Sequence, residues 1–514
     1  MNIVFAFGDD WGRYASAYRQ HDKPNSVNQL ITTPNFDRVA DEGVLFTNAF
    51  VPAPSCTPCR SSVLSGKYFW QTGLGAILIG AVWDDEIPSF PLELEKKGYH
   101  IGHTYKVWSP GKSYNAPYGG KRTSYEAAGT DFNQFSHHVT ERANIVGIEA
   151  AKQELLDEVK MNFNDFLSSR PEDKPFCYWW GPTNTHRTWE QGSGKNLWGL
   201  EPDDLKARMP EFLPDVPEVR EDFCDYLGEC LAFDAGLGVI LKTLEEKGEL
   251  DNTLVVVSGD HGIPGMPRAK CNLYDIGCRV ALGMRWPKHI DPGRVVDDYI
   301  NLMDLAPTFM DAAGAAIPQS MVGRSLMPIL KSKKSGHIEQ ERDFVVLGRE
   351  RHVHSARQGY LPYPQRAIRT EDYLYIINFA PDRWPMGDPM GLDNPTATPP
   401  GYEDLKWDTF VAYADLDASP TKAWMVYNRG EDDVKPLFDL GFHKRPREEL
   451  YDLRKDKDYM INEASNPEYS AVKNRLHHRL MEVLEKYDDP RVVETPCPFE
   501  MAPFAGELQE FQRE

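Results

Sequence analysis

Three short apolar runs in this sequence each end close to polar, chemically reactive residues. The runs cover residues 3–7, 176–181 and 254–258. Runs without alternation that are bounded by turn residues are typical of strands buried on both faces, as in parallel sheets. The polar residues that follow the runs are Asp9 and Asp10, then His186, then Asp260 and His261. Because the carboxyl ends of parallel strands lie at one edge of a sheet, where open α/β folds bind ligands, the pattern predicts an α/β fold with a site at that edge.

Stretches with helical periodicity separate these strands. Thr33 and Pro34 suit the N-cap and first position of a helix, and further helices are predicted over residues 93–99, 141–169 and 222–248. The second of these three is predicted as one long amphipathic helix that lies on the sheet. We therefore expect a large, mostly parallel sheet flanked by helices.

The pattern changes toward the C-terminus. Residues 331–336 read as a linker, and alternation at residues 344–347 and 373–378 predicts strands of a smaller antiparallel sheet. We interpret the chain as a catalytic domain, 1–335, and a C-terminal α+β subdomain, 336–514, that contributes to the substrate cleft.

A second reactive segment begins at Ser55. Ser55 is suited to be a helix N-cap, Pro58 is tolerated in the first turn and Gly66 is a natural stop. Cys56 and Arg60 are then separated by four residues and share one face of the helix. Since the free amides and the positive dipole end of a helix favour a tetrahedral anion, the segment predicts an anion-directed reactive site.

The net charge of the chain limits the kinds of molecule that it can bind. The 514-residue chain carries a formal charge of −21, which argues against nucleic acid as a partner, and no apolar run approaches the roughly 20 residues of a membrane span. An anionic substrate would need a local positive field. The residues that supply it in this prediction are Arg60, Lys106, His186 and Lys270.

The cysteines and the N-terminal residues give weaker indications about disulfides and targeting. Eight cysteines in a chain of this length do not form a disulfide scaffold. Bridges between Cys224 and Cys230, or between Cys271 and Cys278, stay open at this point. The first strand follows Met1 directly, so we expect no signal peptide in this sequence.

The segment around Cys56 resembles the signature of the type I, formylglycine-dependent sulfatases, in which Cys-x-Pro-x-Arg is followed by Ser/Thr-Gly and the cysteine is oxidised to formylglycine. The segments TPNFDRVADEGVLFTNAF and ELYDLRKDKDYMINEASNPEY resemble the same family, the latter before a predicted last helix at 470–487. The segments DHGIPGMPRAKCNLYDIG and YLPYPQRAIRTEDYLYIINF, with Thr-His-Arg at His186, resemble the heparan N-sulfatase (sulfamidase) branch. The resemblance implies an alkaline-phosphatase-like fold, a formylglycine-generating enzyme as maturation partner, and a periplasmic, secreted or lysosomal location.

The resemblance also implies one divalent cation. Its ligands would be Asp9, Asp10, Asp260 and His261, together with the formylglycine made from Cys56. Oxygen ligands favour Ca²⁺, with Mg²⁺ as the other candidate, although the imidazole of His261 is a softer ligand than an asparagine would be.

Further roles follow from the same resemblance. Arg60, Lys106 and Lys270 would hold sulfate oxygens, and His186 would protonate the leaving group. The family's Lys-x-His appears here as Lys106 and Trp108, so the histidine does not carry over, and the indole is expected to stack on a sugar.

Two other segments are predicted to border the substrate. Residues 112–138 lack periodicity and read as a lip of the substrate cleft. A basic cluster is predicted to contact carboxylates or further sulfates of a glycan, since arginine binds such groups in a bidentate manner. Its members are Arg349, Arg351, His352, His354 and Arg357.

We therefore expect a sulfatase that acts on a sulfated oligosaccharide or polysaccharide, at an O-sulfate ester or an N-sulfamate. One alternative is an O-sulfatase of an algal polysaccharide such as ulvan. A second is a phosphodiesterase or phosphonate hydrolase of the alkaline-phosphatase superfamily, with the same metal ligands. A third, a catalytically silent glycan-binding relative, is disfavoured because Cys56, Pro58 and Arg60 are all present.

Overall fold

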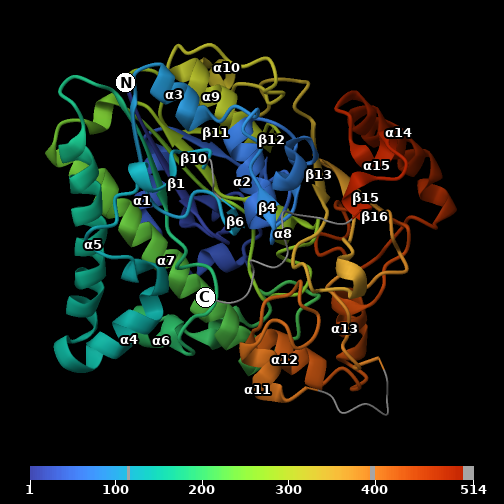
Figure 1. Ribbon diagram of the computed structural model, residues 1–514. Coiled ribbons are helices and arrows are strands. Elements are labelled where there is room, and N and C mark those ends of the chain that lie inside the picture. Colours follow the sequence, from blue (N-terminus) through green and yellow to red (C-terminus); the bar gives the residue numbers. More distant parts are fainter. Residues whose placement is uncertain (113–115, 394–399, 502–514) are drawn as a thin grey trace.

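The computed structural model describes residues 1–112, 116–393 and 400–501 and is built on a seven-stranded sheet (Figure 1). The strand order is β11-β2-β10-β8-β1-β7-β5. Among these strands β10 runs antiparallel to both of its neighbours, and the other pairs are parallel. The bounds are β1 (Asn2–Gly8), β2 (Val44–Phe46), β5 (His100–Tyr105), β7 (Phe176–Gly181), β8 (Thr253–Gly259), β10 (Leu282–Arg285) and β11 (Arg294–Val296). The predicted mostly parallel sheet, with its three buried strands, is confirmed.

The central strand β1 divides the molecule into two apolar layers. Ile3, Phe5 and Phe7 belong to one buried cluster, whereas Val4 and Ala6 belong to the other. This alternation follows from the two-residue period of a strand. The first layer is covered by α2 (Cys56–Ser65), α3 (Phe90–Lys96) and α9 (Leu305–Ala312), and the second by α1 (Pro34–Asp41), α5 (Ile148–Ser169) and α7 (Pro217–Glu246) (Figure 1).

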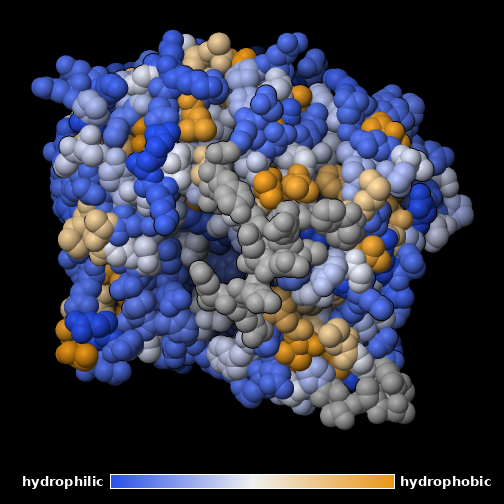
Figure 2. Space-filling model, in the orientation of Figure 1, coloured by the Kyte–Doolittle hydropathy of each residue, from blue (hydrophilic) through white to orange (hydrophobic). Residues whose placement is uncertain are grey.

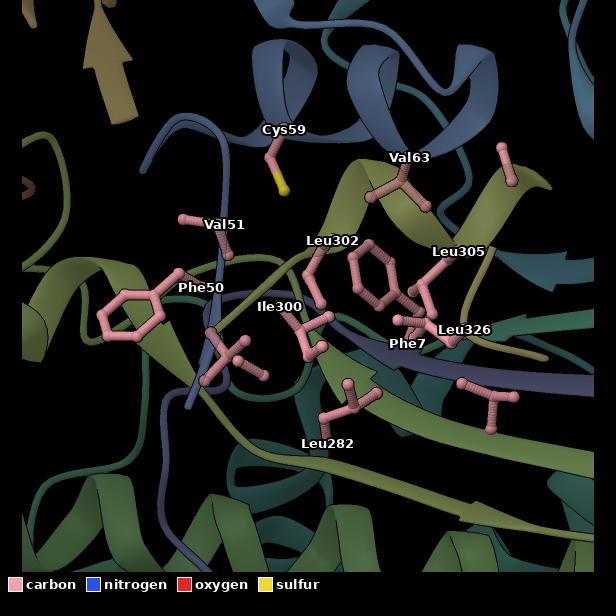
Figure 3. Packing of buried hydrophobic residues seen from close by; sticks show 14 of the residues in the cluster. Phe7, Phe50, Val51, Cys59, Val63, Leu282, Ile300, Leu302, Leu305 and Leu326 are labelled. Atoms are coloured by element: carbon pink, nitrogen blue, oxygen red, sulfur yellow. The ribbon is translucent and has the colours of Figure 1, made fainter. Parts of the chain in front are cut away.

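Helix α2 is fixed by its packing. Figure 3 shows Cys59 and Val63 pointing from α2 into the apolar cluster that contains Phe7, Leu302 and Leu305. Gly66 ends the helix in the left-handed conformation, with φ of 65°, as predicted. The helix start therefore has a defined position above the end of β1.

The predicted cap of this helix is wrong in one respect. Ser55 has the extended backbone of an N-cap residue, but its side chain makes no capping hydrogen bond. Instead, its hydroxyl lies 2.8 Å from Nδ1 of His352. The first amides of α2 are thus left for another partner, as an anion site requires.

The prediction of one long helix at residues 141–169 is also wrong. Gly147, with φ of 88°, separates α4 (Phe135–Val146) from α5, and the two helices contact each other. The apolar period continues across the break, which is why periodicity alone did not reveal it. The first turn of α4, residues 135–138, also occupies the end of the stretch 112–138 that was predicted to be irregular.

The C-terminal part contains a four-stranded antiparallel sheet. Its strands are β13 (Phe344–Arg349), β14 (Gln365–Thr370), β15 (Tyr373–Asn378) and β16 (Glu448–Asp452). Helix α14 (Ser470–Lys486) buries Leu476, Leu480 and Leu484 in a cluster with this sheet. The predicted α/β fold with a smaller antiparallel sheet is confirmed, while the boundary between residues 335 and 336 stays a prediction.

Shorter elements complete the chain. A separate apolar cluster joins α11 (Tyr402–Trp407), α12 (Pro420–Tyr427) and α13 (Lys435–Phe442). The remaining helices are α6 (Ser193–Trp198), α8 (Asp275–Cys278), α10 (Met327–Lys331) and α15 (Pro490–Val493), and the remaining strands are β3 (Ala49–Phe50), β4 (Ala81–Val82), β6 (Gly111–Lys112), β9 (Arg279–Val280) and β12 (Ile300–Asn301).

The surface and the cysteines test the predictions about a membrane span and about disulfide bridges. Figure 2 shows a mainly hydrophilic face with small, separate hydrophobic areas. Within the described residues, every helix is too short or too polar to cross a bilayer. All eight cysteines lie in the described part of the chain and are free, so neither of the two bridges considered above is formed.

A buried carboxyl on α7 leads to a prediction about stability. Glu229 accepts hydrogen bonds from the backbone N–H of Ser136 (3.2 Å) and the side-chain amide of Asn184 (3.0 Å). Burial raises the pKa of Glu229 to about 7. Because the folded state then holds a proton that the unfolded chain releases at lower pH, this group's contribution to stability falls as pH rises.

We expect the free energy of unfolding to lose about 2 kcal/mol from Glu229 between about pH 5.5 and about pH 8. The Glu229→Gln variant cannot ionise and should lack this component. Chemical denaturation of both proteins at the two pH values measures the difference. An identical pH dependence in the two proteins would show that Glu229 does not titrate as described.

Candidate active site

The polar residues predicted at three strand ends come together above the carboxyl edge of the sheet. Asp9, Asp10, Asp260 and His261 are each no more than 1% exposed. The backbone N–H of Asp10 donates to Oδ1 of Asp260 over 2.8 Å, which links the loops after β1 and β8. Gly259 permits this approach, because a Cβ atom there would lie 1.9 Å from the carbonyl oxygen of Trp11.

Arg60 organises two of these carboxylates from the first turns of α2. Its Nε lies 2.8 Å from Oδ2 of Asp260, and its Nη2 lies 3.1 Å from Oδ1 of Asp9. Nη1 donates to the backbone carbonyls of Lys106 and Val107. The guanidinium is 0% exposed, so its hydrogen bonds hold the site together from within.

Lys106 follows β5 and completes the surroundings of Asp9. Its Nζ lies 2.8 and 2.9 Å from the two carboxylate oxygens of Asp9. Burial alone would raise the pKa of Asp9, but the charges of Lys106 and Arg60 outweigh it and hold that pKa well below its usual range. Burial likewise opposes the charge of Lys106, yet Asp9 raises its pKa. Both groups are therefore ionised.

Lys270 contacts both Asp10 and His186, the predicted general acid. Its Nζ lies 2.9 Å from Oδ2 of Asp10 and 3.2 Å from Nε2 of His186. A third contact, 3.2 Å to Oδ2 of Asp417, was not predicted. Asp417 lies far along the chain in an irregular segment with no motif, so the sequence carried no signal for it.

The contacts of His186 define its tautomer. Nδ1 lies 2.7 Å from the carbonyl oxygen of Arg187, which can only accept, so Nδ1 carries the proton. Nε2 then accepts from the Lys270 ammonium. Although burial opposes its charge, Asp10 and Asp417 raise the pKa of Lys270 well above its usual value. Thus Lys270 holds a proton directly beside the unprotonated nitrogen of His186.

Cys56 lies at the centre of this arrangement. Its Sγ is 3.3 Å from Nε2 of His261 and 3.9 Å from Oδ1 of Asp10. Burial, followed by the nearby charge of Asp9, raises the pKa of the Cys56 thiol well above its usual value. An unmodified thiol here is neutral and a poor nucleophile.

The same side chains fit a divalent cation. One potential ligand atom from each of Asp10, Cys56 and His261 lies within 4.8 Å of the others, and the same holds for Asp9, Cys56 and Asp260. Nδ1 of His261 faces the carbonyl of Gly262, which leaves the lone pair of Nε2 directed toward Cys56. Since three carboxylates are already balanced by Arg60, Lys106 and Lys270, a divalent cation would make the site net positive.

Backbone strain marks three positions of the site. Asp10, Tyr105 and Cys271 have positive φ values of 59°, 66° and 67°, which are uncommon for residues other than glycine. One is a proposed ligand, and the other two adjoin Lys106 and Lys270. Such strain persists where the surroundings fix the backbone, and it is concentrated at functional sites.

Trp108 is placed differently from the expectation. Its indole is 1% exposed, its N–H donates to Ser61 over 2.8 Å, and its ring packs edge-on against Trp83. The ring presents no open face to a sugar in this arrangement. Its role as a substrate contact stays a prediction that this packing does not favour.

The predicted basic cluster is largely directed inward. Arg349 and Arg357 each lie 2.6 Å from Oδ2 of Asp415. His352 is 3% exposed, burial lowers its pKa to about 3, and it contacts Ser55. Their internal partners give these residues a structural role, and substrate contact by them stays a prediction.

Of the other two members of the cluster, Arg351 is buried and His354 is half-buried. Arg351 donates to the carbonyl of Ile79 over 3.2 Å and is 2% exposed. His354 is half-buried and stacks on Tyr360. Neither arrangement tests whether these side chains contact a glycan.

Comparison with known proteins identifies relatives over most of the chain. Residues 1–315 match the family model described as Sulfatase, and residues 267–400 match the model of the C-terminal region of N-sulphoglucosamine sulphohydrolase. The chain is 26% identical to human N-sulphoglucosamine sulphohydrolase, over 96% of this chain and 91% of that protein. It is 27% identical to an ulvan-active sulfatase of Formosa agariphila, over 92% of this chain and 78% of that protein.

Solved structures share the fold. A protein in complex with its substrate D-glucosamine-2-N,6-O-disulfate aligns with a TM-score of 0.60 and 19% identity, over 95% of this chain and 98% of that one. The phosphonate monoester hydrolase of Agrobacterium radiobacter aligns with a TM-score of 0.62 and 17% identity, over 95% and 96% of the two chains. Because the Sulfatase model covers more than half of the sequence, the chain belongs to the sulfatase family and is a hydrolase of sulfate esters or sulfamates.

Proposed function

We propose that this enzyme removes sulfate from a sulfated carbohydrate, with an N-sulfated glucosamine as the leading candidate. The convergence of Cys56, three buried carboxylates, the buried cations Arg60 and Lys270, and Lys106, whose side chain is 10% exposed, carries the proposal. The match of residues 267–400 to the N-sulphoglucosamine sulphohydrolase region supports the sulfamate, and the human relative bears the corresponding name.

The nucleophile is proposed to be formylglycine, made from Cys56 by a formylglycine-generating enzyme. Its hydrated aldehyde would provide one hydroxyl as the nucleophile and a second whose deprotonation would release the sulfate and restore the aldehyde. The neutral, buried thiol described above has no second hydroxyl and is a poor nucleophile, so the unmodified residue does not suit this reaction.

The metal is proposed to be Ca²⁺. Asp9, Asp10, Asp260 and His261 would hold it beside position 56, and the bound cation would polarise the sulfate. The oxygen-rich ligand set favours Ca²⁺, and Mg²⁺ is the alternative. Heat-unfolding curves of chelated protein, to which each cation is added back, distinguish the two.

Basic side chains of the protein are proposed to bind the sulfate oxygens and to protonate the leaving group. Lys106 and Lys270, which pair with Asp9 and Asp10, would also hold the substrate oxygens, whereas Arg60 keeps Asp9 and Asp260 in place. When the bond from sulfur to the leaving nitrogen or oxygen breaks, that atom needs a proton. His186, whose side chain is 34% exposed, would take this proton from solvent and deliver it from Nε2, while the ammonium of Lys270, 3.2 Å from Nε2, would stabilise the negative charge that develops on the leaving atom.

The experiment is a comparison of sulfate release from defined sugars. Protein produced together with a formylglycine-generating enzyme should release sulfate from D-glucosamine N-sulfate with a kcat/KM at least about tenfold above its values for sulfated ulvan or carrageenan oligosaccharides. The ulvan-active relative makes ulvan the second candidate, and a reversed order would establish it. Release from none of these sugars would contradict the proposal.

The same preparation separates sulfatase from phosphonate hydrolase chemistry. The phosphonate monoester hydrolase shares only the fold, at 17% identity. We expect nitrophenyl sulfate to be hydrolysed faster than the matching phenylphosphonate ester. A preference for the phosphonate would favour a phosphonate hydrolase.

The cellular location is proposed to be periplasmic, secreted or lysosomal. The name of a Drosophila melanogaster relative, an extracellular sulfatase homologue, supports this proposal.

A further inference from the structure

Asp417 is an acidic side chain in a site built for an anion. It comes from the irregular segment between α11 and α12, in the C-terminal part of the chain. Its Oδ2 lies 3.2 Å from Nζ of Lys270. An acid that only balanced Lys270 would be redundant, because Asp10 already lies 2.9 Å from the same ammonium.

The segment that carries Asp417 is held firmly. The ammonium of Lys422 is buried and donates to the carbonyls of Thr409, Tyr413 and Leu416. Two residues beyond Asp417, the hydroxyl of Ser419 donates to the carbonyl of Gly265 over 2.8 Å, in the catalytic part. The carboxylate of Asp417 is therefore presented by a fixed backbone.

The side chain of Asp417 is partly accessible to solvent. Oδ2 is buried, yet the side chain of Asp417 is 18% exposed, so the exposed area lies on its other atoms. The neighbouring His186 is 34% exposed, whereas Lys270 is 3% exposed. Asp417 and His186 are thus the solvent-accessible neighbours of Lys270, on the side from which a substrate can approach it.

The charge of Asp417 is stable. Burial opposes ionisation, but Lys270 and the imidazoles of His186 and His352 hold the pKa of Asp417 well below its usual range. A fixed negative charge at this point attracts hydrogen-bond donors and repels anions.

We propose that Asp417 determines specificity: it accepts a hydrogen bond from a hydroxyl or ammonium group on the leaving sugar and excludes a second sulfate or carboxylate at that position. The inference deepens the proposed function, on which it rests, by defining the group next to the scissile sulfate. Specificity of this kind combines an attraction for one substrate with a repulsion of its competitor.

The test compares wild type with Asp417→Asn, which keeps the shape and removes the charge, and Asp417→Glu, which keeps the charge. The substrates are D-glucosamine N-sulfate and a D-glucosamine that carries sulfate on both the amine and the neighbouring hydroxyl. For D417N we expect KM for the first to rise about tenfold, with a smaller change in kcat, and the preference for the first over the second to fall by a factor of about ten or more. D417E should retain the preference.

A proportional loss on both substrates would overturn the proposal, because a residue that only positions Lys270 affects them alike. Direct binding of D-glucosamine, measured by calorimetry, gives a readout without turnover. D417N should bind it about tenfold more weakly than wild type. Equal binding of D-glucosamine by wild type and D417N would also overturn the proposal for Asp417. Failure of the wild type to release sulfate from either sugar would instead count against the proposed function, and the binding measurement would still test Asp417.

Discussion

We expect sulfate release to fall by at least about ten-thousand-fold when Cys56 is replaced by alanine, because the proposed nucleophile is then absent. The proximity of Sγ to His261 and Asp10 places position 56 at the centre of the charged groups. The Cys56→Ser variant carries one hydroxyl, which can attack sulfur once but has no second hydroxyl to expel the sulfate. We therefore expect it to show no sustained turnover.

Cys59 provides the matched control for this prediction. It lies one turn further along α2, is 0% exposed and points into the apolar core (Figure 3). Cys59→Ala should lower the midpoint of thermal unfolding while kcat stays within about threefold of wild type. Substantial multiple-turnover activity in C56A would contradict the assignment of the nucleophile.

Replacing Arg60 has the second large effect, on stability as well as on activity. Arg60 lies between Asp9 and Asp260 with all three groups buried. Removing one partner of a buried ion pair leaves an uncompensated charge, so Arg60→Ala should cost about 3–5 kcal/mol of unfolding free energy. Arg60→Lys keeps the charge but not the planar donor set, and should still lose activity by about a hundredfold or more.

Arg366 is the matched control for Arg60. It forms a comparable buried network with Asp489 and Glu350, in the C-terminal part of the chain, and it does not pair with the carboxylates that Arg60 holds. Arg366→Lys should lower stability to a similar extent as R60K, yet folded R366K should retain kcat. Denaturation curves together with kinetics on nitrophenyl sulfate separate the two effects. Equal kcat values for R60K and R366K would argue against an organising role for Arg60.

The sheet and the residues at its edge follow from local signals. The buried runs at β1, β7 and β8 have no alternation, and each is followed by the polar residues that meet at the site. Parallel strands must end at one edge, so the convergence of Asp9, Asp10 and Asp260 is a consequence of topology. The extent of α2 is likewise encoded locally, because Pro58 lies in its first turn and Gly66 ends it.

Features that depend on distant partners were not visible in the sequence. Arg349 and Arg357 read as surface charges until Asp415 is seen between them. Asp417 has no local signal, because its role depends on Lys270, which lies about a quarter of the chain away. The break at Gly147 interrupts an apolar period that continues on both sides, since α4 and α5 are both amphipathic.

The most direct test of the central claim is mass spectrometry of the peptide that contains Cys56, on protein produced with a formylglycine-generating enzyme. We predict that this peptide has lost its sulfur and gained an aldehyde oxygen, and that sulfate release rises in proportion to the converted fraction. Full sulfatase activity in protein whose Cys56 is an unaltered thiol would contradict the account.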